Sequence, residues 1–161
     1  MTVTTSSPLL SERQEQALDN VGAFYQLPDM HDALVNGARL RFGVIADPQY
    51  ADADPQKVRY YRNSLNKLST AINELNDLKL DFVVTLGDLV DRDWSSFQAV
   101  LGCYDKLRHP HAVVIGNHDA QVITEHLGAQ KPAIGLPKSY YAFSLPGYRF
   151  LVIDGNDVSL Y

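Results

Sequence analysis

The sequence predicts an α/β fold built around a parallel sheet, and three observations support this fold class. Three short segments are almost continuously apolar, as strands buried on both faces of a parallel sheet are: residues 39–47, 80–88 and 111–119. The two stretches between them carry apolar residues at helical spacing. The resulting order of strand, helix, strand, helix, strand indicates a βαβαβ core with right-handed crossovers.

The region before this core divides into two parts. Residues 1–10 are rich in Ser and Thr, and we expect them to be disordered. Residues 11–38 predict an N-terminal helix followed by a loop, because Ser11 and Gln14 have the spacing of a capping box. The folded domain is therefore expected to span residues 39–161.

Two helices are predicted within the βαβαβ core. The first covers residues 57–78, where apolar residues alternate steps of four and three: Tyr61, Leu65, Leu68, Ile72 and Leu75. The second is predicted to begin with a capping box formed by Ser95 and Gln98. Its apolar face would then consist of Phe97, Val100, Leu101 and Tyr104.

The segment after the third strand predicts less regular structure. Residues 122–127 favour a short helix or turn. The segments SYYAFSLPG and YRFLVIDGN are strand-like and are joined by Pro146 and Gly147. They predict a C-terminal antiparallel hairpin added to the sheet.

Composition restricts the classes of function. The chain is 45% hydrophobic and 20% charged, as soluble globular proteins are, and its apolar runs are too short to span a membrane. Its net charge of −5 and its 14 scattered basic residues argue against nucleic-acid binding. Cys103 is the single cysteine, which excludes an intrachain disulfide, and the N-terminus does not resemble a secretory signal. We therefore expect a cytoplasmic protein.

Each of the three predicted strands ends in polar residues. The donors that follow the strands are Asp47, Gln49, Asp88, Asn117 and His118. Ligands of open α/β sheets bind outside the carboxyl ends of the strands, so we expect these side chains to lie within one small volume. The carboxylates would then repel one another unless a cation lies between them, and oxygen donors favour ions such as Mn²⁺ or Mg²⁺.

Two glycines support the same interpretation. Gly87 and Gly116 each directly precede a donor, at positions where one backbone must pass close to another. Several other residues favour ordinary roles. Tyr61 and Cys103 are expected in the core, Arg59 and Arg62 on a solvated helix flank, and His109 and His111 on the surface or in a turn.

The motifs D-x-Q, G-D-x-x-D-R and G-N-H-D follow one another on successive βα units. In this order they resemble the motifs of the calcineurin-like metallophosphoesterase superfamily. The segments FGVIADPQYAD, with Gln49 where most members have histidine, and RYYRNSL are similar to one branch, the manganese-dependent ADP-ribose/CDP-alcohol diphosphatases. The resemblance covers residues 39–161. It implies the N-terminal half of an αββα sandwich that hydrolyses phosphoanhydride bonds in nucleotide diphosphate derivatives.

The resemblance also implies a binuclear metal centre, with Mn²⁺ preferred and Mg²⁺, Fe or Zn as alternatives. It assigns Asp47 and Gln49 to one ion, Asn117 to the other, and Asp88 to both. The metals would polarise the phosphoryl oxygens and activate a water that attacks in line. The expected partner is a small nucleotide substrate, with neither a nucleic acid nor a membrane.

Four further residues receive roles around the scissile phosphate. His118 would stabilise charge or protonate the leaving oxygen, and Asp91 would hold the metal ligands in place by hydrogen bonding. Arg92 could orient a substrate phosphate, or it could pair with Asp91 or Asp93. Tyr50 lies beside the site in the sequence and could stack on a nucleobase.

The chain also departs from the pattern of the superfamily. Members complete the site with an isolated histidine and a G-H-x-H motif in their C-terminal half, and neither occurs up to Tyr161. We therefore expect a truncated or split copy with impaired activity, an exposed sheet edge and association through that edge.

Two other functions stay open at this point. The first is a phosphodiesterase acting on cyclic nucleotides or other esters, although Gln49 replaces the histidine common in such sites. The second is a non-catalytic fragment that binds metal or nucleotide, or pairs with a complementary chain.

Overall fold

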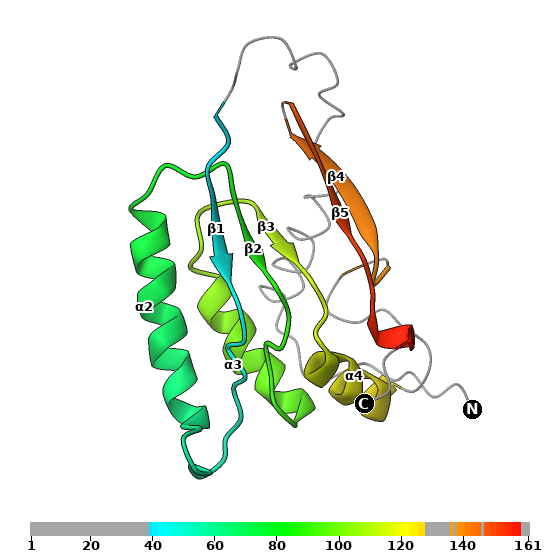
Figure 1. Cartoon of the computed structure of the whole chain (residues 1–161). Helices are drawn as coiled ribbons and strands as arrows, with labels where there is room; N and C mark the ends of the chain where they lie inside the picture. The colour runs from blue at the N-terminus through cyan, green and yellow to red at the C-terminus, as the bar shows by residue number, and fades with distance from the viewer. Residues whose placement is uncertain (1–38, 128–135, 137, 146, 159–161) are drawn as a thin grey trace, which may run out of the picture.

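The computed structural model describes residues 39–127, 136, 138–145 and 147–158 (Figure 1). The expectations for residues 1–10 and 11–38 lie outside the described residues. A short 3₁₀ turn, η3 (Asn156–Val158), ends the described part of the chain.

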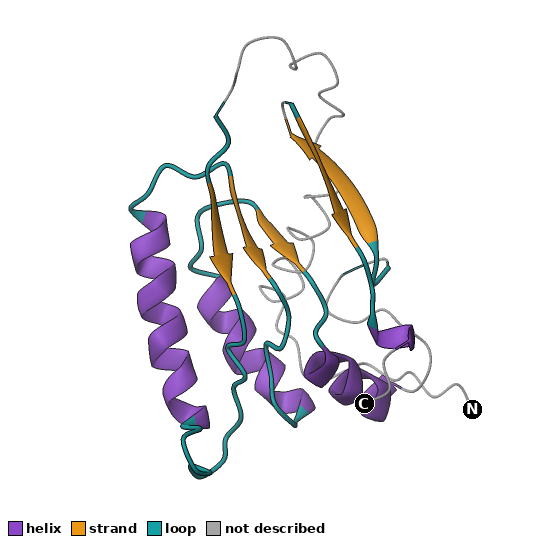
Figure 2. Cartoon of the chain, viewed as in Figure 1, coloured by secondary structure: helices purple, strands orange, loops and turns teal. Residues whose placement is uncertain are grey.

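A three-stranded parallel sheet forms the centre of the fold. Strands β1 (Phe42–Ile45), β2 (Phe82–Thr85) and β3 (His111–Val113) pair in the order β1-β2-β3, so that Ile45, Thr85 and Val113 are aligned across the sheet. Helices α2 (Ser64–Asn76) and α3 (Trp94–Tyr104) connect the strands and lie against one face (Figures 1 and 2). The predicted βαβαβ core is confirmed, with strands shorter than expected.

The helices begin at other positions than predicted. Helix α2 starts at Ser64 and follows a 3₁₀ turn, η2 (Tyr61–Asn63). Residues 56–59, where the helix was predicted to begin, instead form a turn in which Gln56 and Arg59 exchange backbone hydrogen bonds of 3.0 and 2.9 Å. The capping box expected at Ser95 and Gln98 is wrong. Helix α3 already begins at Trp94, and the residue before it, Asp93, has the extended backbone of a helix cap without a side-chain capping bond.

The third helix is longer than the sequence suggested. Helix α4 (Asn117–Leu127) starts inside the GNHD motif, whereas only a short helix or turn over residues 122–127 was predicted. The core between the helices and the sheet is made of residues from all three helices and β3: Leu68, Ile72, Val100, Val113 and Ile123. The expectation that Tyr61 and Cys103 are core residues is also confirmed, with exposed fractions of 5% and 8%.

The C-terminal hairpin does not extend the parallel sheet. Strands β4 (Tyr141–Leu145) and β5 (Tyr148–Val152) form a separate antiparallel sheet of two strands. The rings of Phe143 and Phe150 pack against Phe82 of β2, with centroid distances of 5.5 and 5.1 Å. Packing face to face buries these rings between two sheets, which edge-to-edge hydrogen bonding could not do. The predicted hairpin is therefore correct, but its predicted placement is wrong.

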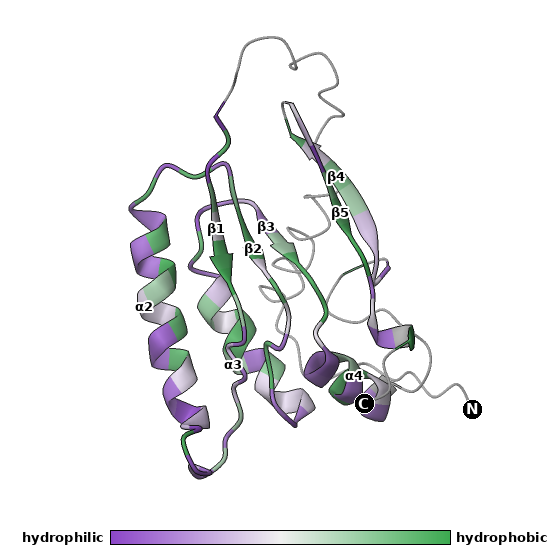
Figure 3. Ribbon diagram, in the orientation of Figure 1, coloured by the Kyte–Doolittle hydropathy of each residue, from purple (hydrophilic) through white to green (hydrophobic). Residues whose placement is uncertain are grey.

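Part of the apolar surface stays exposed in the described structure. Strand β1 is an edge strand, and Phe42 and Val44 are 44% and 51% exposed, so the expected burial of both its faces is wrong. Leu151 and Ile153 are also exposed, on and just beyond β5. Figure 3 shows the strands as mainly hydrophobic and α2 as two-sided. Among the described helices, none has the length and apolar character needed to cross a membrane.

Candidate metal centre

The loops that follow β1 and β2 run side by side beyond the ends of the strands. The backbone N–H groups of Gln49 and Tyr50 donate to the carbonyl oxygens of Asp88 and Leu89, at 2.8 and 3.1 Å. The N–H of Asp91 donates back to the carbonyl of Tyr50 at 2.9 Å. These bonds hold the Asp-x-Gln and GDLVDR segments together at the carboxyl edge of the sheet, where the sequence predicted a site.

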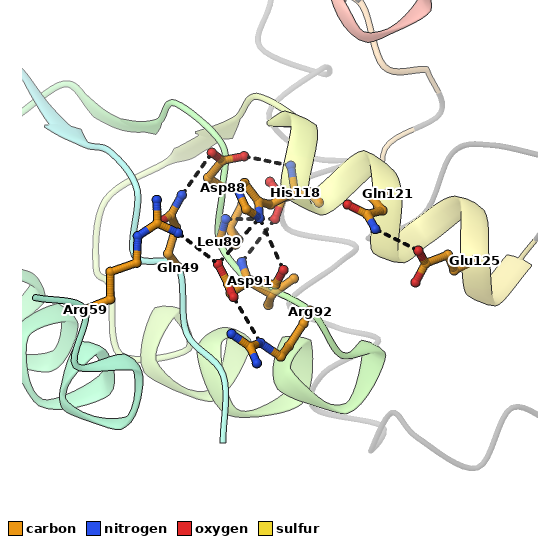
Figure 4. Close-up of polar contacts among 11 residues, drawn as sticks. Gln49, Arg59, Asp88, Leu89, Asp91, Arg92, His118, Gln121 and Glu125 are labelled. Carbon is orange, nitrogen blue, oxygen red and sulfur yellow. Dashed lines mark hydrogen bonds and ion pairs between the residues drawn. The ribbon is translucent and has the colours of Figure 1, made fainter. Parts of the chain in front are cut away.

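Asp88 links the three strand ends. One of its carboxylate oxygens, Oδ2, accepts a hydrogen bond from Nε2 of Gln49 at 3.3 Å, and Oδ1 accepts one from the backbone N–H of His118 at 3.0 Å (Figure 4). The donor from His118 lies in the first turn of α4, where the helix dipole favours a negative charge. Among the described residues, no cationic side chain forms an ion pair with Asp88.

The expected close approach at the two glycines is confirmed. A Cβ atom on Gly87 would lie 2.4 Å from the backbone nitrogen of Gly116. A Cβ atom on Gly116 would lie 2.1 Å from Oδ1 of Asp88. The backbones after β2 and β3 therefore touch at these two residues, which places Asp88 directly beside the start of α4.

A second carboxylate, Asp91, lies beneath this arrangement and is 7% exposed. Nδ1–H of His118 donates to the carbonyl oxygen of Asp91 at 3.2 Å and lies 3.5 Å from its Oδ1. Nε of Arg92 binds Oδ2 at 3.1 Å, and Nη1 of Arg59 lies 3.6 Å from Oδ1 (Figure 4). Asp91 thus connects the imidazole of His118 with two arginines.

The structure brings together only part of the predicted ligand set. Asp88 is contacted by the side chain of Gln49 and by the backbone N–H of His118. The side chains of Asp47 and Asn117 are exposed, and neither forms a hydrogen bond or ion pair with another described residue. Asp47 is two positions before Gln49, and Asn117 is the first residue of α4, so both still lie on the segments that form the site.

The predicted substrate-binding residues have protein partners. Arg92 pairs with Asp91, and its guanidinium lies 4.8 Å from the ring centre of Tyr61. The hydrogen bond that Arg92 donates to the carboxylate of Asp91 is the main reason that the pKa of Arg92 is raised. Tyr50 is half-buried and packs against the helix-side core. The expectation that Arg59 and Arg62 are solvated is confirmed, because their side chains are 54% and 52% exposed. Each also has an acidic neighbour: Arg59 lies near Asp91, and Arg62 pairs with Asp52 and Asp54.

Two residues outside the predicted site also differ from expectation. His111 was expected on the surface or in a turn, but its Nε2 lies 2.7 Å from Oγ1 of Thr85 and its ring stacks on Tyr104. Burial lowers the pKa of His111 to about 3. Asp119, the last residue of GNHD, was not predicted to have a role, yet it is fully buried. Burial raises its pKa to about 7, although three backbone hydrogen bonds oppose this shift.

The donor set determines whether these residues fit a metal ion. In the part of the chain that the structure describes, no group of three or more His, Cys, Asp and Glu side chains is placed to hold a metal. The neighbour of Asp88 is instead the side-chain amide of Gln49, whose Nε2 lies 3.3 Å from Oδ2 of Asp88. This distance is close to the ~3 Å that separates neighbouring ligand atoms around an octahedral ion with ~2.1 Å bonds. Rotating the Gln49 amide by half a turn would place its oxygen there. The half-buried Asp88, which has no cationic partner among the residues that the structure describes, therefore fits an oxygen-binding divalent cation.

Comparison with known proteins adds independent information. A family model described as calcineurin-like phosphoesterase matches residues 40–159. Two relatives named manganese-dependent ADP-ribose/CDP-alcohol diphosphatase, from Xenopus tropicalis and Arabidopsis thaliana, are 36% and 34% identical. Their matches cover 73% of this chain in both cases, and 45% and 43% of the relatives.

A solved structure is similar as well. The crystal structure of a dimetal phosphatase from Danio rerio superposes with a TM-score of 0.58 at 29% sequence identity. The similarity covers 75% of this chain and 46% of that chain. The protein thus spans about half the length of the relatives that it matches.

Proposed function

The chain belongs to the calcineurin-like phosphoesterase family, and from this premise we propose that its strand-end residues serve the hydrolysis of phosphoanhydride bonds. The proposed substrates are nucleotide diphosphate derivatives such as ADP-ribose and CDP-alcohols, with Mn²⁺ as the metal, as the names of the relatives suggest. The observation that carries the proposal is the position of Asp88 between Gln49 and His118 at the ends of three parallel strands.

The proposed metal ligands are those that the resemblance of the motifs to the family implies. Asp47 and Gln49 would bind one ion, Asn117 would bind a second, and Asp88 would contact both. When bound, the ions would polarise the phosphoryl oxygens and lower the pKa of a water molecule. Asp88 is the member of this set for which neighbouring contacts support the role most directly.

The other residues act on protons and charge. Because Nδ1–H of His118 donates to Asp91, Nε2 is the nitrogen left to exchange a proton with a leaving oxygen. Asp91 orients the imidazole, and its buried charge is balanced by Arg59 and Arg92. The side chain of Arg92 is 39% exposed, which leaves its guanidinium able to contact a phosphate as well. Half-buried Tyr50 would stack on the nucleobase.

The test compares two Asp→Asn variants. Asp88→Asn removes the charge proposed to lie between the ions. Asp77→Asn makes the same change at an exposed residue that caps the far end of α2. Binding of Mn²⁺ would be followed by electron paramagnetic resonance of the free ion, and release of AMP from ADP-ribose by chromatography, with and without chelator.

Each outcome decides between functions. The proposal expects Mn²⁺ binding and any Mn²⁺-dependent AMP release to be lost in Asp88→Asn and kept in Asp77→Asn. Turnover confined to cyclic nucleotides would instead favour a phosphodiesterase. Metal binding without any turnover would favour a non-catalytic role, and a chain that binds no Mn²⁺ at millimolar concentration would exclude the proposed metal site.

A further inference from the structure

A single carboxylate joins the two loops that carry most of the proposed site. Oδ1 of Asp119 accepts hydrogen bonds from the backbone N–H groups of Leu89 and Val90, at 2.8 and 3.1 Å. Its other oxygen, Oδ2, accepts one from the N–H of Gly116 at 3.1 Å. The side chain is fully buried, so these three bonds are made away from water, where leaving a donor unpaired is expensive.

The two oxygens have different roles. The bond from Gly116 to Oδ2 is local, three residues along the chain, and caps the first turn of α4 in the manner of a capping box. The bonds to Oδ1 come from residues 30 and 29 positions earlier, in the loop after β2. Helix capping therefore explains the hydrogen bond to Oδ2, but it does not explain the two hydrogen bonds to Oδ1.

The residues held by Oδ1 directly follow Asp88. The backbone of Asp88 has a φ of 50°, in the left-handed region that a residue with a Cβ atom adopts only at a cost of ~1–2 kcal/mol. Such a conformation persists when the surrounding structure fixes it. The bonds to Leu89 and Val90 fix the chain immediately after the strained residue, and the bond to Gly116 fixes the segment immediately before Asn117 and His118.

We infer that Asp119 is a positioning residue, which sets the distance between Asp88 and the start of α4 and thereby the geometry of the metal site. The inference rests on the proposed function for its consequence, which is the effect on metal affinity. The role of Asp119 in holding the two loops together does not depend on the proposed function, because its three hydrogen bonds are formed within the chain and involve no metal.

The charge-free variant Asp119→Asn has nearly the same shape and tests this role. A carboxylate offers two acceptor oxygens, whereas an amide offers one acceptor and an NH₂ donor. In the variant, either Gly116 or the pair Leu89 and Val90 would face a donor and lose its hydrogen bond. The matched control is Glu125→Gln, the same chemical change on the same helix. Glu125 is exposed, and among the described residues its one hydrogen-bond partner is Gln121, one turn earlier (Figure 4).

The measurement is titration of each purified chain with Mn²⁺ alone, with the free ion read by electron paramagnetic resonance. Substitution of a residue that orients metal ligands typically weakens metal affinity by ~10–100-fold. We expect a loss of that size in Asp119→Asn and an unchanged Kd in Glu125→Gln. A merely structural role would lower the stability of Asp119→Asn but leave the Kd of the folded protein unchanged, and this result would overturn the inference.

A second measurement applies even if Asp119→Asn does not fold or the wild-type chain binds no Mn²⁺. Amide hydrogen exchange of the wild-type protein, followed by NMR, reports directly on Leu89 and Val90. The inference expects both amides to be protected as strongly as those of β2. Exchange at the rate of an open loop would overturn it. A wild-type chain with protected amides but no Mn²⁺ binding would contradict the proposed function and leave Asp119 as the residue that joins the loops.

Discussion

The contact between Gly116 and Asp88 predicts a sharp difference between two glycine substitutions. In Gly116→Ala the new Cβ atom would lie 2.1 Å from Oδ1 of Asp88 and 2.3 Å from its backbone nitrogen. Non-bonded heavy atoms are comfortable at ~3.5 Å, so the two segments must separate by ~1 Å. In Gly102→Ala the new atom would meet nothing within 4 Å, in the interior of α3.

The magnitudes follow from these two environments. Forcing an extra methyl group into a packed position costs ~1–3 kcal/mol, and Gly116→Ala should lie at the upper end because one of the colliding atoms belongs to the backbone. Gly102→Ala should instead raise the free energy of unfolding by up to ~1 kcal/mol, since alanine has the higher helix propensity. The two substitutions therefore change stability in opposite directions.

The assay is urea denaturation followed by the fluorescence of Trp94, the one tryptophan in the sequence. Titration with Mn²⁺ adds a second readout, because the separation displaces Asp88 and should weaken metal binding in Gly116→Ala alone. Equal stabilities of Gly116→Ala and the wild type, within ~0.5 kcal/mol, would refute the close approach of the two loops.

Two further predictions concern the core. In the folded protein the pKa of His111 is about 3, below its ordinary value of ~6.5. As the pH falls, the unfolded chain therefore takes up a proton on this histidine before the folded chain does. Between pH 7 and pH 5, protonation of His111 in the unfolded chain should lower the free energy of unfolding by ~2 kcal/mol. The variant His111→Gln should lack this loss, and urea denaturation at each pH measures the difference. Phe143→Ala should cost ~3–5 kcal/mol because the ring is 7% exposed and packs on Phe82 and Phe150. The free energy of unfolding of the neighbouring variant Ser144→Ala should stay within ~0.5 kcal/mol of the wild-type value in the same denaturation assay.

The elements that the sequence predicted correctly are those set by local pattern. The apolar runs of β1, β2 and β3, and the stripe through Leu68 and Ile72, need only their own segment to be recognised. The start of α3 was missed because Ser95 and Gln98 match a capping box, while the extended backbone of Asp93 ends the preceding loop earlier. The placement of the hairpin depends on contacts between Phe82, Phe143 and Phe150, which are far apart in the sequence.

The candidate site divides in the same way. The meeting of Gln49, Asp88 and His118 could be predicted, because consecutive parallel strands end at one edge of the sheet. The pairing of Asp91 with Arg59 and the bonds from Asp119 to the loop after β2 could not, since no spacing rule connects them. The signal available in the sequence for Asp119 was an acidic residue three positions after Gly116, the spacing of a capping box, and this spacing does not reveal the distant partner.

Backbone strain in this structure is concentrated where the chemistry is proposed. Of the four described non-glycine residues with positive φ, three follow β1 and β2: Asp47, Gln49 and Asp88, with values of 51°, 42° and 50°. Local preference opposes these conformations, so they must be retained by hydrogen bonds and close packing from other segments. For Gln49 and Asp88 those restraints are visible, in the bond from the Gln49 N–H to the Asp88 carbonyl and in the contact with Gly116. The side chains are therefore aimed by the surrounding fold, and a substitution that relaxes the backbone should disturb metal binding before it disturbs folding.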